Sequence, residues 1–291
     1  MDKRVLYFSQ FILSIVFMSS SGALGRFIDL PVPVIIWSRC ILAAVALFSV
    51  LKITKQSVSL KSKSDFFTIL VTALLLGSHW VTYFLALKYS SVAIGMLSMF
   101  TYPVMTAVIE PLLFGSKFDI RSVLLALFSF SGVVFLVPEF SIGNQVTIGV
   151  LFGLFSALTY AIRNILSKRI VSGYSGLTVM MYQAMLIAIM LTPSIFFMGD
   201  NDFVALEMNG WIAVVLLGIY TTAVGHSLLV NSFAHFPVIT LSTISCLTPL
   251  FGIIQGYLFL GEKPTHQVMI GGVIILIAAV LESLRLLKRT N

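Results

Sequence analysis

Charged side chains are scarce in this chain of 291 residues. Lys, Arg, Asp and Glu make up 10% of the residues, whereas 58% are hydrophobic and the mean hydropathy is +1.04. Soluble domains carry about 25% charged residues, because their surfaces face water. The scarcity excludes an ordinary soluble domain and indicates a membrane protein.

Motifs for catalysis and for cofactors are also missing. The four histidines form no HExxH motif, and the sequence has neither a GxSxG elbow nor a GxxxxGK[ST] loop. Cys40 and Cys246 lie in apolar runs without a CxxC pattern, which favours a role as small apolar filler. We therefore expect no enzyme, no cofactor and no metal site.

Basic residues exceed acidic ones by seven, and their distribution explains the excess without nucleic acid. With a cytoplasmic N-terminus, 13 of the 18 Lys and Arg fall on the inner side, and only Arg26, Lys88 and Lys263 fall outside. The positive-inside rule thus predicts that both termini are cytoplasmic. The loop at 200–207, which holds three acidic residues, is then external.

Ten apolar runs are long enough to cross a bilayer as helices. They cover residues 5–25, 34–51, 66–87, 90–114, 120–137, 148–167, 175–197, 210–233, 237–260 and 267–287. The first run is long for a secretory signal and nine more follow it, so we expect it to remain as a span. The runs do not alternate as barrel strands do, which predicts an all-α polytopic membrane protein.

Two segments repeat their prolines and glycines at an offset of 146 residues. The pairs are Pro103/Pro249, Leu112/Leu258, Gly115/Gly261 and Lys117/Lys263. The offset predicts two halves, 1–140 and 141–291, with five helices each. Since five is odd, the second half enters the membrane in the opposite sense, and the halves form an inverted repeat. The GxxxG pairs in GVLFG (149–153) and GIIQG (252–256) favour close helix packing inside the chain.

The segment TPLFGIIQGYLFLGEKPTHQVMIGGVIILIAAVLE (248–282) resembles the EamA domain of the drug/metabolite transporter superfamily, and ALKYSSVAIGMLSMFTYPVMTAVIEPLLFGSK (86–117) resembles the same motif. The chain departs from this pattern at Ser116, where the second half has the acidic Glu262, and at the additional Glu110. The resemblance implies an exporter of amino acids, related small metabolites or toxic compounds in a bacterial inner membrane.

Polar and aromatic residues near mid-membrane are the candidates for substrate binding. They are His79, Trp80, Tyr83, Tyr102, Tyr160 and His226, together with Arg39 nearer the outer surface. Aromatic faces suit an apolar or cationic group, and Arg39 suits a carboxylate. Helix-to-helix hydrogen bonds for the histidines and plain packing for the tyrosines are the alternatives.

Glu110 is an acidic residue inside an apolar run and is followed by Pro111. A carboxylate at this depth is expensive, so it serves either to couple transport to protons or to pair with Arg163 or Arg169. Arg163 lies about one turn from the inner surface, where snorkelling is the default expectation. Pro103 and Pro249 weaken two helices near their middle, which predicts bending or gating there.

These observations together favour a secondary transporter that exports a small, partly hydrophobic molecule by alternating access. The expected partners are that substrate, the lipid bilayer and protons. A passive facilitator or channel and a membrane-embedded enzyme are the alternatives.

Overall fold

A computed structural model describes residues 3–114, 119–137, 141, 143–171, 173–197, 206–236, 241, 244–245 and 247–290, and this part is helical without a β-strand. Within these described residues, seven helices have the length and apolar composition to cross a membrane, and three shorter apolar helices accompany them. The chain is therefore a multi-pass membrane protein. Cys246, Lys117, Ser116 and most of the loop at 200–207 lie outside the described residues.

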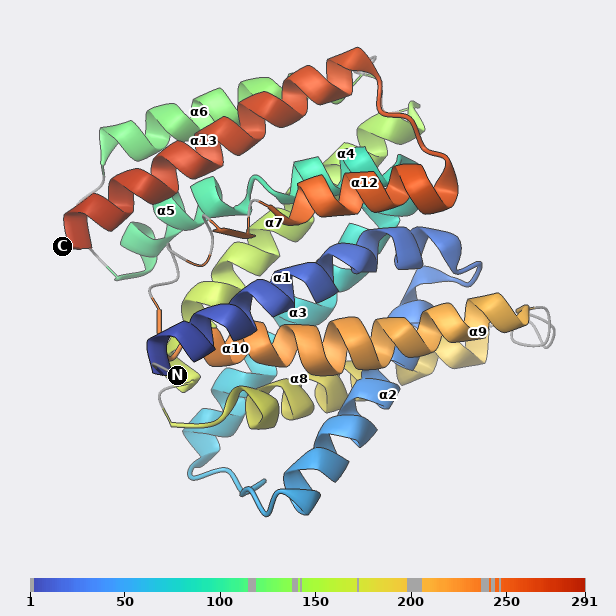
Figure 1. Ribbon diagram of the computed structural model, residues 1–291, viewed down its shortest axis with the longest axis vertical. Coiled ribbons are helices and arrows are strands. Elements are labelled where there is room, and N and C mark those ends of the chain that lie inside the picture. Colours follow the sequence, from blue (N-terminus) through green and yellow to red (C-terminus); the bar gives the residue numbers. More distant parts are fainter. Residues whose placement is uncertain are drawn as a thin grey trace. The chain divides into compact units, whose positions relative to one another are not determined.

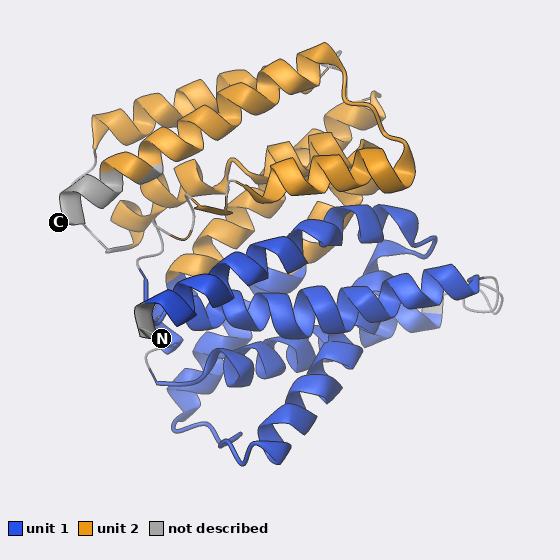
Figure 2. Ribbon diagram, in the orientation of Figure 1, with its two compact units in different colours: residues 1–77, 166–236 blue, residues 78–165, 237–291 orange. Residues whose placement is uncertain are grey.

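The helices divide into two compact units, residues 1–77 with 166–236 (unit 1) and residues 78–165 with 237–291 (unit 2) (Figure 2). Each unit takes segments from both predicted sequence halves. The predicted repeat concerns the order and direction of helices along the chain and not their compactness, and it stays a prediction.

Unit 1 is built around α2, α8 and a long interrupted helix. Its elements are α1 (Lys3–Phe27), α2 (Val32–Ile53), the start of α3 (Lys63–Tyr89), the end of α7 (Gln145–Ile170), α8 (Gly176–Leu191), η1 (Thr192–Phe197), α9 (Met208–Val215), η2 (Leu216–His226) and α10 (Ser227–Ser232). Helix α2 packs against α8 and η2, and α1 packs along η2 and α10 (Figure 1). Gly176 brings α8 against the α10 backbone, because an added Cβ would lie 2.6 Å from Asn231 N.

Unit 2 contains the rest of α3 and α7, with α4 (Val92–Met99), α5 (Tyr102–Phe114), α6 (Ile120–Val134), α12 (Thr248–Leu260) and α13 (His266–Thr290). Helices α6 and α13 lie side by side, and α4 packs against α12 (Figure 1). The GVLFG motif on α7 is confirmed as an internal contact, since a Cβ on Gly149 would lie 2.9 Å from Ser90 Cβ and one on Gly153 would lie 2.7 Å from Ser98 Cβ.

Local sequence explains where α12 ends and α4 begins. Gly261 follows α12 in the left-handed conformation (φ 68°), where glycine has no steric penalty because it lacks a Cβ. The turn presents Glu262 to α4, where its Oε2 accepts the Val92 N–H at 2.8 Å. Ser91 caps the same helix by accepting the Ile94 N–H. The Leu-Gly-Glu motif thus joins α12 to α4.

Candidate functional site

A helix break lies in the fourth predicted span, beside Pro103. Helix α4 ends at Met99 and α5 begins at Tyr102, so the run at 90–114 is two helices. Proline lacks the N–H that would continue the helical ladder, and the backbone between the helices is covered by protein. Broken backbone at membrane depth is tolerated in such covered positions. Pro249 takes a corresponding place in the first turn of α12.

Four of the predicted substrate residues meet in unit 2 as one buried group, which we call the aromatic cluster: His79, Tyr83, Tyr102 and Tyr160. The ring centroids of His79 and Tyr160 are 4.3 Å apart and stacked, and His79 also stacks on Tyr83 at 6.0 Å. Tyr102 meets Tyr160 edge-on at 4.9 Å. Helices α3, α5 and α7 therefore place these rings together, with Tyr102 directly at the break.

Ser156 of α7 fixes the His79 ring. Its hydroxyl donates to the His79 carbonyl at 3.0 Å and lies 2.7 Å from His79 Nδ1. Because Nδ1 also lies 3.2 Å from the Ser156 carbonyl, which can only accept, we assign the proton to Nδ1. In the neutral ring Nε2 is then the acceptor. Sequence reasoning missed Ser156, although it lies one turn before Tyr160 on the same face of α7.

Trp80 and Arg163 are buried residues that lie close to members of this cluster in the sequence. Trp80 follows His79 on α3 and is 1% exposed. Arg163 is one turn after Tyr160, is fully buried, and donates to Asn164 Oδ1 at 3.1 Å. The expectation that Arg163 snorkels is wrong, because its guanidinium is enclosed by protein.

Arg39 and His226 belong to unit 1, whereas the four residues of the aromatic cluster belong to unit 2. Arg39 is fully buried on α2, and its Nε donates to Thr222 Oγ1 at 2.8 Å while Nη2 donates to Thr221 Oγ1 at 3.3 Å. Both threonine hydroxyls donate in turn to the Leu217 carbonyl of η2. Element η2 is a π-helix, a wider turn that is frequent at functional sites. His226 is buried at its C-terminal end.

Glu110 is half-buried on α5, directly before Pro111. Within the described residues of unit 2 it forms no ion pair, with Arg163 or with any other side chain. Arg169 belongs to unit 1. The structure therefore gives no support to the ion pair with Arg163, and the coupling role of Glu110 stays a prediction.

A fully buried carboxylate on α13 was not anticipated from the sequence. Glu282 on α13 is fully buried and accepts the Ser122 hydroxyl of α6 at 2.6 Å. Arg285 pairs with both Glu282 and Asp119, the residue that caps α6. The Arg285 guanidinium offsets part of the negative charge of the two carboxylates, and the group holds α6 against α13. The sequence signal was available, since Glu282 and Arg285 are spaced three apart on one helix.

Metal chemistry has no candidate site in the described part of the chain, where no group of three or more His, Cys, Asp or Glu side chains could hold an ion. The arrangement instead offers aromatic faces, hydroxyls and an imidazole inside a helical membrane unit. Such a set can bind a small molecule reversibly through stacking and directional hydrogen bonds.

Known proteins resemble the chain over almost its entire length. The profile of the EamA-like transporter family matches residues 6–137 and again residues 147–284. The uncharacterized transporter YxxF of Bacillus subtilis is 26% identical over 284 residues, which cover 96% of this chain and 90% of the relative. An uncharacterized transporter of Archaeoglobus fulgidus is 25% identical over 195 residues, covering 67% of this chain and 68% of the relative.

A solved crystal structure shares the fold, with a TM-score of 0.70 and 18% identity over 98% of both chains. These similarities agree with the apolar helices and with the superfamily that the Leu-Gly-Glu segment resembles. Because the family profile covers most of both sequence halves, this chain belongs to the EamA-like transporter family.

Proposed function

We propose that this protein is a secondary transporter that exports a small, partly hydrophobic metabolite by alternating access. The observation that carries the proposal is the buried aromatic cluster at the break between α4 and α5. Transporters build substrate sites where discontinuous helices expose backbone and side chains near the midplane. Family membership supports transport in place of catalysis.

The substrate class follows from the chemistry of the cluster. Stacked rings of His79, Tyr83 and Tyr160 favour an apolar, aromatic or cationic moiety, and the Tyr102 and Tyr160 hydroxyls with His79 Nε2 supply hydrogen bonds. Amino acids, related metabolites and organic cations meet this description. We assign Arg39 to the attraction of a substrate carboxylate.

The proposed topology has ten membrane helices in a bacterial inner membrane, arranged as inverted repeats 1–140 and 141–291 with both termini in the cytoplasm. The double match of the family profile supports two repeats. The seven long and three shorter apolar helices support ten spans. Reporter fusions after Glu207 and after Thr290 test the orientation, and a cytoplasmic signal at Glu207 contradicts it.

Glu110 is the proposed proton-coupling residue. Its support is a half-buried carboxylate without an ion pair among the described residues of unit 2. If Glu110 takes up the coupled proton, Glu110→Gln folds and binds substrate but loses the pH dependence of transport. A wild-type pH profile in that variant, together with lower thermal stability, indicates a structural role.

Counterflow in proteoliposomes tests the function directly. Purified protein is screened against amino acids, dipeptides and organic cations, and saturable counterflow of one class is the expected result. Unitary conductance would identify a channel instead, and conversion of the compound would identify an enzyme.

Variants of His79 then test the site. His79→Ala is expected to abolish counterflow, because it removes both the stacked ring and Nε2, while His79→Gln retains part of it. The matched control is His235→Ala, which removes an exposed histidine of unit 1 that stacks on Tyr7 outside the cluster. Wild-type counterflow in His79→Ala contradicts the proposed site.

A further inference from the structure

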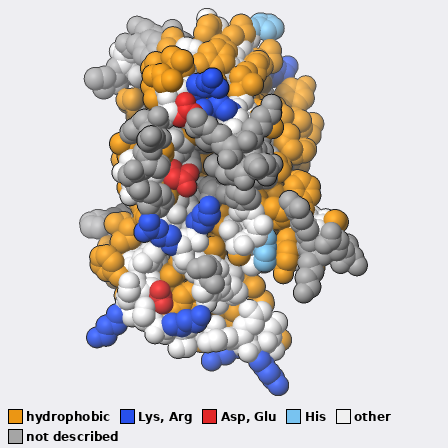
Figure 3. Space-filling model, turned by 90° about the vertical axis from the view of Figure 1, so that its left-hand side faces the viewer, with side chains coloured by type: hydrophobic (Ala, Val, Ile, Leu, Met, Phe, Trp, Pro, Cys, Tyr) orange, Lys and Arg blue, Asp and Glu red, His pale blue; other side chains and the backbone are white. Residues whose placement is uncertain are grey.

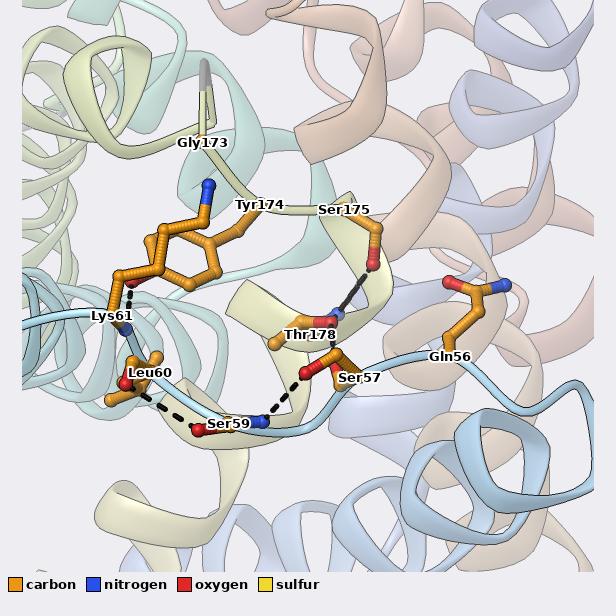
Figure 4. A pocket seen from close by; sticks show the side chains of 9 residues that line it. All are labelled: Gln56, Ser57, Ser59, Leu60, Lys61, Gly173, Tyr174, Ser175 and Thr178. Atoms are coloured by element: carbon orange, nitrogen blue, oxygen red, sulfur yellow. Dashed lines mark hydrogen bonds between the residues drawn. The ribbon is translucent and has the colours of Figure 1, made fainter.

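Unit 1 contains a polar pocket whose lining includes none of the residues assigned to transport. It lies between the connection from α2 to α3 and the segment that leads from α7 into α8, and its volume is about 430 Å³. Its lining residues are Gln56, Ser57, Ser59, Leu60, Lys61, Gly173, Tyr174, Ser175 and Thr178 (Figure 4). Four helix ends therefore converge on this pocket.

Hydrogen bonds between the two segments hold its walls in place. The Tyr174 hydroxyl accepts the Lys61 backbone N–H at 2.7 Å and donates to Asp65 Oδ2 at 2.7 Å. The Tyr182 hydroxyl donates to the Val58 carbonyl at 2.7 Å. These bonds connect residues more than one hundred positions apart. The pocket is thus a built feature of the tertiary structure.

The walls offer donors and one cation. The Lys61 ammonium lies over the Tyr174 ring, 5.4 Å from its centroid, and points along the wall toward Gly173 (Figure 4). Ser57 Oγ accepts the Ser59 N–H, which leaves the Ser57 hydroxyl proton able to donate. Ser59 adds a hydroxyl that donates to the Leu60 carbonyl over a long 3.5 Å, and the Ser175 hydroxyl lies 2.9 Å from Thr178 Oγ1. No acidic residue lines the pocket, so the lining is suited to an anion with several acceptor oxygens.

The charged side chains near the pocket are mainly positive. Lys52, Lys55, Lys61 and Lys63 are all exposed, and the only acidic residue between positions 52 and 65 is Asp65, which accepts from Tyr174. Lys and Arg side chains project around the lower, mostly white part of the face in Figure 3. The candidate membrane helices α2, α3, α7 and α8 each end or begin here, and the ends of membrane helices are found at the depth of lipid headgroups. Basic clusters at such helix ends attract anionic lipid.

We propose that this pocket binds a phosphate ester, through the Lys61 ammonium and the Ser57 and Ser59 hydroxyls. A phosphate has enough acceptor oxygens to use these donors together, and the remaining volume accommodates a glycerol-sized group. Two sources share this chemistry, the headgroup of an anionic phospholipid and a soluble phosphate ester. This proposal does not depend on the transport proposal, because its test measures ligand binding alone.

Thermal stability of the purified chain tests the proposal with defined probes. Phosphatidylglycerol, phosphatidylcholine or inorganic phosphate is titrated into detergent-solubilised protein, and the apparent affinity is taken from the rise in Tm. Phosphatidylglycerol is expected to stabilise the wild type, and Lys61→Gln is expected to bind it roughly fivefold more weakly, as the loss of one lysine at a membrane surface predicts. Lys61→Arg keeps the charge and retains most of the response.

The control is Lys168→Gln, which removes an exposed lysine of α7 outside the pocket lining. Stabilisation by phosphatidylglycerol alone identifies lipid as the source, and an equal effect of inorganic phosphate identifies a soluble ester. Equal responses of wild type and Lys61→Gln, or an equal loss in Lys168→Gln, overturn the proposal. Ser57→Ala provides a second variant of the same site if Lys61→Gln folds poorly, and an unchanged response there has the same meaning.

Discussion

The contact between α7 and α4 makes Gly153 the position where a single methyl group should be costly. A Cβ at this position lies 2.7 Å from Ser98 Cβ and still closer to Ser98 Oγ, whereas carbon atoms pack at about 3.5–4.0 Å. Ser98 cannot move away freely, because its hydroxyl donates to Ile94 and Gly95 carbonyls. Gly153→Ala therefore requires the two helices to separate by about 1 Å.

Overpacking of this kind costs about 1–3 kcal/mol. At roughly 2–4 °C per kcal/mol for a chain of this size class, a cost near 2 kcal/mol lowers Tm by about 4–8 °C. The assay is thermal unfolding of the detergent-solubilised protein, with counterflow measured in parallel. Counterflow should fall as well, because the displaced α7 also carries Ser156 and Tyr160.

A matched control and a rescue make this prediction sharp. Gly143→Ala places its methyl group in a turn, 3.6 Å from Ser141 Oγ, and should leave Tm unchanged. Ser98→Gly removes the opposing side chain, so the double variant should be more stable than the sum of the two single changes implies. A Tm for Gly153→Ala equal to that of Gly143→Ala would refute the packing argument.

Three further changes test contacts inside the individual units. Glu262→Ala should lower the unfolding free energy by about 1 kcal/mol, because it removes the cap on the Val92 N–H, while Glu262→Gln keeps an acceptor and stays near wild type; thermal unfolding compares them. Arg285→Met leaves the buried Glu282 without its arginine and should cost about 3 kcal/mol, with a smaller loss for Arg285→Lys in the same assay. Desolvation, followed by the hydrogen bond that its hydroxyl donates to Asp65, raises the pKa of Tyr174 above its ordinary value of 10.0. The hydroxyl therefore stabilises the fold fully below pH 10.0, and this stabilisation is lost as the pH rises through the raised pKa. Above pH 9 the free energy of unfolding should fall less steeply with pH in Tyr174→Phe than in the wild type. Identical pH slopes in the two proteins would contradict this assignment.

The sequence by itself determined the class of the protein and the positions of most membrane helices. Hydropathy averaged over about 20 residues reports the transfer of a whole helix into lipid, and this quantity does not depend on which neighbours the helix later meets. Helix α2 accordingly covers the predicted span 34–51, and α8 together with η1 covers residues 176–197 of the predicted span 175–197. Glycine spacing on α7 was informative for the same reason, since a missing side chain permits close approach whatever the partner.

Sequence also nominated His79, Tyr83, Tyr102 and Tyr160, because polar and aromatic groups at mid-membrane are costly without a purpose. It did not reveal that these four meet while His226 lies in the other compact unit. Depth along a helix can be counted from residue numbers. Rotation about the helix axis, which decides what a side chain faces, is set by packing against neighbours.

Only the tertiary structure decided the partners of the buried polar groups. Ser156 forms a hydrogen bond with His79, Thr222 accepts a hydrogen bond from Arg39, and Arg163 is buried in protein instead of reaching the surface. A hydrogen bond forms only where packing brings the donor within a few ångströms of an acceptor. A buried donor is satisfied equally well by any acceptor that packing brings near it. Hydropathy fixes which helices enter the membrane, but the choice among those acceptors is made when the helices pack.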